Sequence, residues 1–347
     1  MLKQSLKLIQ KLQYKNGLFA AAAKDVRTGY NLSWLRDNVY ISLGLQKVDK
    51  KSAIRNLRAL LDILLKHEHK IDWMIAKPYP KYNFRYIHAR YDPATMEEIR
   101  QEWGNKQNDA VGALLFAVGD FESKRMKVIR NDKDKRVLAK LVYYLAAIEY
   151  WHDSDNGMWE ENEEVHASSV GACVAGLKKI SKVIDVDPEM IEELIERGRI
   201  TLHNLLPRES ATKHTDLALL SLIYPYNVVT KWQKHLILRN VESILVRNKG
   251  VIRYVGDKYY NNGSYSGGEA EWCFGLTWLA IIHREQKNPA KYAVYMRKAT
   301  LAMNSKGEMP ELYYSNSEEH NENSPLGWAQ AMYVDAVNNK FSIKLNI

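Results

Sequence analysis

Apolar residues recur at helical spacing along almost the whole chain, whereas the alternating pattern of strands is scarce. In VLAKLVYYLAAIEYW, residues 137–151, the apolar side chains fall three and four positions apart. The same periodicity predicts about twelve helices, near residues 2–14, 33–47, 51–67, 107–119, 134–151, 166–183, 187–204, 214–223, 230–247, 268–285, 289–303 and 325–339. Twelve consecutive helices would form six helical hairpins.

The predicted helices are of two kinds. HASSVGACVAGLKKI, residues 166–180, is dense in Ala, Ser and Gly, which let neighbouring backbones approach closely. PEMIEELIERGRITL, residues 188–202, is charged on one face. We expect the first kind to be internal and the second external, an alternation that a closed ring of helical hairpins requires. No sequence repeat links the hairpins, which disfavours a solenoid.

Five long segments between the predicted helices are rich in Trp, Tyr, Arg and acidic residues. They are residues 15–32, 70–106, 152–165, 249–267 and 304–324. Each follows a predicted outer helix and precedes an inner one, so a ring would gather all five at one end. Function tends to lie on such connections when a rigid scaffold holds them.

The composition is that of a soluble globular protein. Hydrophobic residues make up 46% and charged residues 26% of 347 residues, and no low-complexity linker divides the chain. We therefore expect one domain over residues 1–347. The net charge of +9 is spread along the chain rather than clustered, so a nucleic-acid partner is not expected.

The N-terminal segment, the apolar runs and the cysteines bear on where in the cell the protein is expected. The first fifteen residues, MLKQSLKLIQKLQYK, have lysines among the apolar positions and so predict an amphipathic helix rather than a secretory leader. No run of eighteen apolar residues follows, so no membrane span is expected. Cys173 and Cys273 lie in apolar helical patterns and are interpreted as buried free thiols, which fits the cytoplasm.

The residue types in the connections suit a sugar. The stretches SWLRDN, EWGNKQND, GMWEEN, IRYVGDKYYNNG and GEMPELYY combine aromatic rings with planar hydrogen-bonding groups. Sugar rings stack on aromatic faces, while their hydroxyls need paired donors and acceptors. The alternative is that these aromatic side chains only pack against the end of the barrel.

A pair of carboxylates indicates that the sugar is a substrate for hydrolysis as well as a ligand. Hydrolysis of a glycosidic bond needs one protonated acid for the leaving oxygen and one ionised carboxylate. Glu160 and Glu311 are the candidates. In DSDNGMWEENEEVH, residues 153–166, Glu160 stands among like charges, and neighbouring anions and burial both raise a carboxyl pKa, as a general acid requires.

The order and spacing of six motifs resemble a known family. WLRDN, WGNKQND, GMWEE, RYVGDKYYNNG, PELYY and PLGWAQAMYV, spread over nearly the full length, are similar to the glucoamylase family of glycoside hydrolases, family fifteen. That family includes the related domain of phosphorylase kinase regulatory subunits. The resemblance implies an all-α fold, an (α/α) six-hairpin barrel with inner and outer rings, in agreement with the helix count.

The resemblance also assigns roles. It implies that Glu160 is the general acid, that Glu311 is the base that activates water, and that the reaction inverts the anomeric carbon. It further implies an exo-acting enzyme that releases glucose from a small oligosaccharide or disaccharide. The substrate-binding residues that it implies, a terminal-sugar set followed by Arg253 for the next sugar, are Trp34, Arg36, Asp37, Trp103, Gln107, Asp109, Trp159, Glu161 and Arg253.

Some positions depart from the family pattern. Leu312 follows Glu311 where the family commonly has glutamine, and GNKQ and DAVG replace GRPQ and DGP. The stretches WLRDNVY, HASSVG, GEAEW and PELYY are closer to the kinase-subunit branch. The second hypothesis is therefore a glycan-binding or regulatory module without catalysis.

Other chemistries are not indicated. The ten histidines form no HExxH motif and the two cysteines form no CxxC pair, so no metal is expected. No glycine-rich phosphate-binding motif is present, so no nucleotide cofactor is expected.

Overall fold

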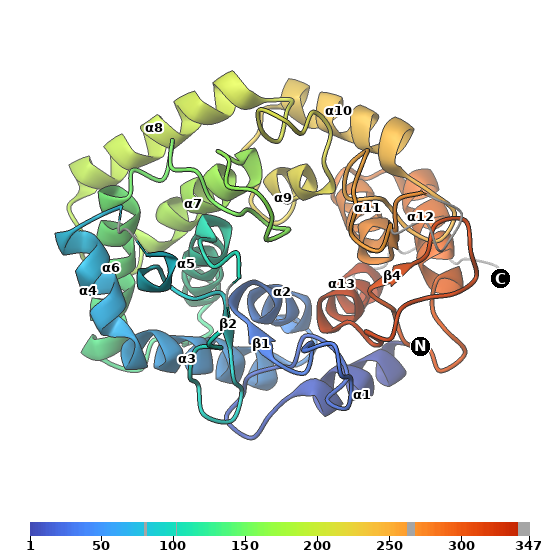
Figure 1. The fold of residues 1–347 in the computed structure, drawn as a ribbon, viewed down its shortest axis with the longest axis horizontal. Coiled ribbons are helices and arrows are strands. Elements are labelled where there is room, and N and C mark those ends of the chain that lie inside the picture. The colour runs from blue at the N-terminus through green and yellow to red at the C-terminus, as the bar shows by residue number, and fades with distance from the viewer. Residues whose placement is uncertain (80–81, 102, 262–267, 339–347) are drawn as a thin grey trace.

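The computed structural model describes residues 1–79, 82–101, 103–261 and 268–338. Within these ranges it is an almost entirely helical molecule in which two concentric rings of helices surround a common axis (Figure 1). The inner helices are α2 (Leu35–Leu45), α5 (Asn108–Ser123), α7 (Ala167–Ile180), α9 (Leu220–Ile223), α11 (Phe274–Glu285) and α13 (Gly327–Asn338). The outer helices are α1 (Leu2–Leu12), α3 (Lys50–Lys66), α4 (Glu68–Ala76), α6 (Asp132–Ala147), α8 (Pro188–Leu205), α10 (Lys231–Asn240) and α12 (Pro289–Leu301).

The inner ring is closed. Each inner helix packs against the next, and α13 packs against α2 to join the two ends of the chain's helical order. Most outer helices pack against an inner neighbour along the chain, as α8 with α7 and α12 with α11, whereas α1 packs against α13 and α4 against the outer helix α6. The expected (α/α) six-hairpin barrel is confirmed.

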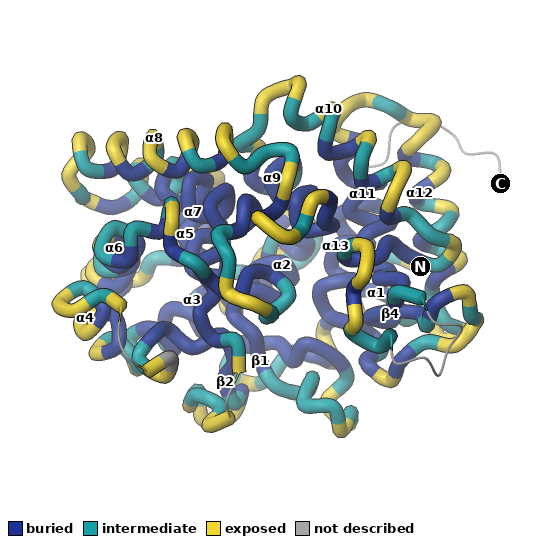
Figure 2. The backbone as a smooth tube through the Cα atoms, turned by 45° about the horizontal axis from the view of Figure 1, so that its top comes forward, coloured by how far each residue is buried: buried dark blue, intermediate teal, exposed yellow. Residues whose placement is uncertain are grey.

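Burial follows the two kinds of helix that the sequence distinguishes. Most residues of α5 and α7 are buried, whereas α8 buries only Ile191, Leu194, Gly198 and Leu202 (Figure 2). Glycine permits the close approach of α5 and α7, because a Cβ on Gly112 would lie 2.4 Å from backbone atoms of Ala172 and Cys173. Small residues thus set the spacing of the inner ring.

The helix starts differ between the two rings. Several outer helices begin at side-chain caps from their own N-cap residues, which are Asp49, Asn131, Asp187, Thr230 and Asn288. Inner helices α5 and α7 are instead capped by carboxylates from other connections. Asp155 accepts from the backbone N–H of Asn108 at 2.8 Å, and Glu209 accepts from that of Ser168 at 3.1 Å. These caps tie the connections at one end of the barrel to the inner ring.

Short strands and non-α turns account for most differences from the predicted boundaries. The predicted helix at 268–285 begins only at Phe274, because β3 (Glu271–Trp272) pairs with β4 (Leu312–Tyr313). Likewise β1 (Ser33–Trp34) pairs with β2 (Arg90–Tyr91) before α2 begins.

Other predicted elements also differ in extent. The segment at 214–223 is a 3-10 turn, Leu217–Leu219, followed by the short α9, and α10 continues as a π-helix over Val241–Leu245. Helix α4 overlaps the start of residues 70–106, which were expected to be a connection. Residue 339, the last of the predicted final helix, lies outside the described residues.

No helix within the described ranges has the length and apolar character of a membrane-spanning segment.

Candidate active site

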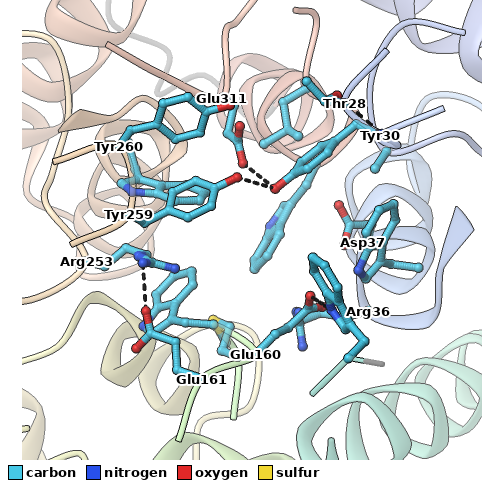
Figure 3. A pocket seen from close by; sticks show the side chains of 18 residues that line it. Thr28, Tyr30, Arg36, Asp37, Glu160, Glu161, Arg253, Tyr259, Tyr260 and Glu311 are labelled. Atoms are coloured by element: carbon cyan, nitrogen blue, oxygen red, sulfur yellow. Dashed lines mark hydrogen bonds and ion pairs between the residues drawn. The ribbon is translucent and has the colours of Figure 1, made fainter. Parts of the chain in front are cut away.

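One end of the barrel holds a cavity of about 460 Å³. All five connections that the sequence singled out reach it, together with the first turns of α2 and α13. The side chains around it are largely aromatic or charged (Figure 3). They are Ala21, Thr28, Tyr30, Trp34, Arg36, Asp37, Trp103, Met158, Trp159, Glu160, Glu161, Arg253, Tyr259, Tyr260, Trp272, Glu311, Leu326 and Trp328. The connection of residues 206–216 lies behind this lining.

Glu160 is carried by a tight loop. Asp155 and Glu164 pair in an antiparallel bridge that closes the loop. Gly157 and Glu160 both have positive φ values, +63° and +61°. A left-handed glutamate costs conformational energy and is found where the surrounding structure imposes it, often at functional sites. The loop therefore holds Glu160 in a strained conformation at the cavity.

The surroundings of Glu160 differ from the like-charged environment expected from its neighbours in sequence. Its carboxylate accepts a hydrogen bond of 2.9 Å from Arg36 and another from the indole N–H of Trp103. Glu161 is turned to other partners, Arg253 at 2.8 Å and Lys213 at 2.6 Å. The adjacent acids are thus neutralised separately, because the loop directs successive side chains in different directions.

Glu311 lies deeper. It is 1% exposed, and its carboxylate accepts hydrogen bonds from Tyr30 at 2.7 Å, from Asn323 at 2.7 Å and from Asn321. Burial raises the pKa of Glu311, and the three donors offset part of that rise. A carboxylate that accepts three hydrogen bonds is prepared to act in its ionised form.

The two glutamates belong to one site. Glu311 reaches the cavity from the connection before α13, and Glu160 reaches it from the connection before α7, on the opposite side (Figure 3). Their environments differ, since Glu160 is paired with a cation and Glu311 is held by neutral donors. Two carboxyl groups with different surroundings, facing one cavity, are the arrangement that acid–base hydrolysis of a glycoside requires.

Arg36 is fixed from behind. Its guanidinium donates to Gln107 at 2.8 Å and forms an ion pair of 3.1 Å with Asp109. Gln107 and Asp109 were expected to line the pocket, but both are buried behind Arg36 at the start of α5 and do not line it. Their place in the site is to hold Arg36 toward Glu160.

Asp37 follows Arg36 in the first turn of α2. Within the described part of the chain, its carboxylate has no ion-pair or side-chain hydrogen-bond partner, because the adjacent Arg36 binds Asp109 and Glu160. Burial raises the pKa of Asp37 to about 7, against the opposing effect of Arg36. With no side-chain partner among the residues that the structure describes, this carboxyl at the cavity wall can accept hydrogen bonds from a ligand's hydroxyls.

Arg253 is surrounded by rings and acids. It forms a two-pronged contact with Asp257, at 2.7 and 2.6 Å, and its third contact is with Glu161. The guanidinium carbon lies 4.9 Å from the ring centre of Tyr259 and 5.1 Å from that of Trp272. These contacts engage Nε and Nη2 of the guanidinium and hold it between aromatic rings.

Trp159, which directly precedes Glu160 and Glu161, has a structural role in their loop. Its indole N–H donates to Asp216 at 2.8 Å, and its ring packs 5.7 Å from that of Trp272. Asp216 lies in the connection before α9, so Trp159 anchors the Glu160 loop across the end of the barrel. Trp159 and Glu160 thus both line the cavity, while Trp159 also ties the loop to the scaffold.

Sequence reasoning missed several residues of the site. The cavity also contains Tyr30, Tyr259, Tyr260, Trp272 and Trp328. Tyr30 stands four residues before Trp34 in a connection already singled out, so its position near WLRDN was the available signal. The sequence held no signal for the donors Asn321 and Asn323, because their contact with Glu311 depends on how the chain turns back after β4.

Leu312, the departure beside Glu311, points away from the cavity. It is fully buried and pairs with Trp272 in the β3–β4 ladder. Because neighbouring side chains of a strand point to opposite faces, Glu311 and Leu312 have opposite surroundings. The change from glutamine to leucine therefore alters the barrel wall rather than the cavity lining.

Among the described residues, no three His, Cys, Asp or Glu side chains form a group that could hold a metal ion. Cys173 and Cys273 are free and buried, as expected.

Comparison with solved structures shows the same fold elsewhere. A structure titled "Glycosidase Wild Type" matches with a TM-score of 0.83 and 19% identity, over 97% of this chain and 95% of that one. A glucoamylase from Saccharomycopsis fibuligera matches with a TM-score of 0.71 and 14% identity, over 97% and 94%. A bacterial glucoamylase complexed with acarbose matches with a TM-score of 0.70 and 16% identity, over 96% and 54%.

Curated relatives carry a different name. The chain is 24% identical over 374 residues to the probable phosphorylase b kinase regulatory subunit alpha of Caenorhabditis elegans, which covers 87% of the chain. It is 24% identical over 375 residues to the skeletal muscle isoform of that subunit from Mus musculus. In each case the chain spans 30% of the relative's length.

The family itself is shown by a match over most of the chain. The profile described as "Glycosyl hydrolases family 15" matches residues 1–264, which include the connections that carry Glu160, Arg36 and Arg253. The resemblance read from the six motifs is confirmed. This chain belongs to glycosyl hydrolases family 15.

Proposed function

We propose that the protein is an exo-acting, inverting α-glycoside hydrolase that releases glucose from short α-glucans or a related disaccharide. The observation that carries the proposal is the pair Glu160 and Glu311, which face one sugar-sized cavity from opposite sides in different environments (Figure 3). A cavity inside a ring of helices suits the end of a sugar chain better than its middle, which favours exo action.

The reaction then takes one step. Glu160, in its protonated form, gives its proton to the glycosidic oxygen as the bond from that oxygen to the anomeric carbon breaks. Glu311, ionised, accepts a proton from a water molecule whose oxygen bonds to the anomeric carbon from the opposite face. The products are the shortened chain and β-glucose. Glu311 then releases its proton to solvent and Glu160 takes one up, which restores the starting state. In inverting enzymes the two carboxyls stand roughly 6.5–9.5 Å apart to admit that water.

The charged wall would position the terminal sugar. Asp37 accepts from hydroxyl groups, and Arg36 donates to them while it remains fixed by Asp109. The rings of Trp34 and Trp103 offer faces on which a sugar can stack. Arg253 lies further along the lining and would contact the next sugar.

The experiment that tests the proposal is proton NMR of maltose, isomaltose, trehalose and maltotriose incubated with the protein. Early appearance of β-glucose supports inverting hydrolysis, and early α-glucose contradicts it. Glu160→Gln and Glu311→Gln should each reduce the rate by orders of magnitude without loss of the folded state. Glu163→Gln, which changes an exposed acid of the same loop, is the matched control and should keep the wild-type rate. A near-normal rate in either of the first two variants would remove that residue from the mechanism.

The names of the curated relatives favour a second candidate, a regulatory or glycan-binding module that keeps the cavity without turnover. The same NMR experiment separates the two. Line broadening or shifts of the sugar signals without release of glucose would support the module.

We also propose the cytoplasm as the compartment. Cys173 and Cys273 are both free thiols in the barrel wall, which fits a reducing environment.

A further inference from the structure

Arg90 lies just outside the cavity lining and touches two of its tryptophans. It is the first residue of β2 and stands opposite Trp34 of β1 in the antiparallel register. Its guanidinium carbon is 5.4 Å from the ring centre of Trp34 and 4.1 Å from that of Trp103. Arg90 is only 4% exposed, and its buried Nε has no hydrogen-bond partner within the described residues. A cation has been buried here chiefly against aromatic faces.

Trp103 needs such support. It is 40% exposed and lies in the connection before α5, outside any helix or strand. Its indole N–H nevertheless donates to Glu160. An exposed side chain on a connection loses conformational entropy when it is held in one position, so an additional contact must fix its ring.

Arg90 supplies contacts at two points of this connection. One face of its guanidinium packs on the Trp103 ring, and its Nη2 donates to the side chain of Gln101 at 2.9 Å. The backbone of Arg90 is fixed in turn, because its N–H donates to His88 at 3.0 Å and its strand pairs with β1. The contacts thus run from the β1–β2 ribbon through Arg90 to Trp103 and end at the carboxylate of Glu160.

We propose that Arg90 is a positioning residue of the site. It holds the Trp103 ring so that the indole N–H orients the carboxyl of Glu160 and the ring face stays aligned with the cavity. The catalytic part of this proposal rests on the proposed hydrolysis, whereas the position of Trp103 can be measured without it. Arginine suits the role because its planar guanidinium stacks on a ring while its edge donates, which the compact ammonium of lysine cannot do.

The first experiment compares hydrolysis by Arg90→Met, Arg90→Lys and Arg85→Met. Arg85→Met is the matched control, because Arg85 lies 5.8 Å from the ring of Trp73, which does not line the cavity. We expect at least a tenfold loss of kcat/KM in both Arg90 variants, with kcat reduced and the alkaline limb of the pH profile displaced. The control should stay within twofold of wild type. Wild-type kcat in Arg90→Met would overturn the proposal.

A double-mutant cycle tests whether Arg90 acts through Trp103. In the background Trp103→Leu, Arg90→Met should change kcat/KM by less than twofold, since the group that it positions is gone. If the fold losses of kcat/KM in the two single variants multiply in the double variant, Arg90 acts by another route and the proposal fails.

Acrylamide quenching of tryptophan fluorescence tests whether Arg90 holds the Trp103 ring in place, independently of turnover. The contribution of Trp103 is the difference between each protein and its Trp103→Leu counterpart. Arg90→Met should make this contribution at least twice as quenchable, and Arg85→Met should leave it unchanged. Equal quenching in wild type and Arg90→Met would overturn the proposal. If the wild type releases no glucose while quenching rises in Arg90→Met, the proposed hydrolysis fails but the positioning of Trp103 stands.

Discussion

The hydroxyl of Tyr30 donates a hydrogen bond of 2.7 Å to Oε1 of Glu311, and the hydroxyl of Tyr259 lies 3.1 Å from that of Tyr30. The candidate base is therefore held by one phenol, Tyr30, on Oε1 and by two asparagines on Oε2. Burial raises the pKa of Tyr30 far above its ordinary value, so this hydroxyl remains a donor throughout the working pH range.

Tyr30→Phe should slow hydrolysis by roughly tenfold or more, since a hydrogen bond to a charged group contributes about 1.5 kcal/mol or more. The hydrogen bond lowers the pKa of Glu311, so its loss should move the acidic limb of the pH–rate profile to higher pH. Tyr313→Phe is the control, because that buried hydroxyl donates to the backbone of Ala302 instead. An unchanged acidic limb in Tyr30→Phe would contradict this assignment of the base.

Asp37→Asn should stabilise the protein at alkaline pH while it impairs hydrolysis. Burial raises the pKa of Asp37 from 3.8 to about 7, so between these pH values the folded state holds a proton that the unfolded chain has released. Stability therefore falls as pH rises through that window, and the amide removes this loss. The gain at pH 8 is up to about 4 kcal/mol, and it should vanish near pH 4.

Urea unfolding at both pH values measures this difference. Asp132→Asn, which changes a residue 98% exposed on α6, should show no such pH dependence. Lower stability of Asp37→Asn than wild type at pH 8 would show that the carboxylate stabilises the fold.

Asp109→Asn should destabilise the protein by about 3 kcal/mol or more, because it removes one member of a buried ion pair. Arg36 and Asp109 are 4% and 2% exposed, so water cannot replace the lost charge. Thermal unfolding measures the loss, and hydrolysis should fall with it because Arg36 would no longer be fixed beside Glu160. Asp132→Asn again serves as the exposed counterpart, with an expected change close to zero.

Gly112→Ala tests how the inner ring is packed. In a helix interior, alanine is favoured over glycine by about 1 kcal/mol. Here the added Cβ would lie 2.4 Å from the backbone of α7, and relieving that clash costs about 1–3 kcal/mol or more. We expect a lower Tm by differential scanning calorimetry. A raised Tm would mean that α5 and α7 can separate without cost.

The helices were predictable because their apolar periodicity is set locally, along three or four turns. Helix α4 was missed because its nine residues follow α3 almost directly and bury only Lys70, Ile71 and Met74. The strands were missed because two residues show no periodicity, and their pairing depends on partners far along the chain. Local pattern therefore predicted the ring better than the contacts at its end.

The same limit applies to the site. The motifs placed Gln107 and Asp109 near the cavity, but a motif cannot show which residues face a ligand and which support Arg36 from behind. Asn323 contacts Glu311 at a separation of twelve residues and Tyr30 contacts it across 281, distances over which sequence patterns carry no signal.

The contact of α13 with α2 has a consequence for synthesis of the protein. The lining is drawn from residue 21 to residue 328, and the last inner helix completes the circle only when it meets the first. A growing polypeptide on the ribosome consequently cannot complete the lining of this cavity until Trp328 has emerged. Products that terminate before α13 would lack both this closing contact and Trp328, so the cavity forms in one step, when α13 packs against α2.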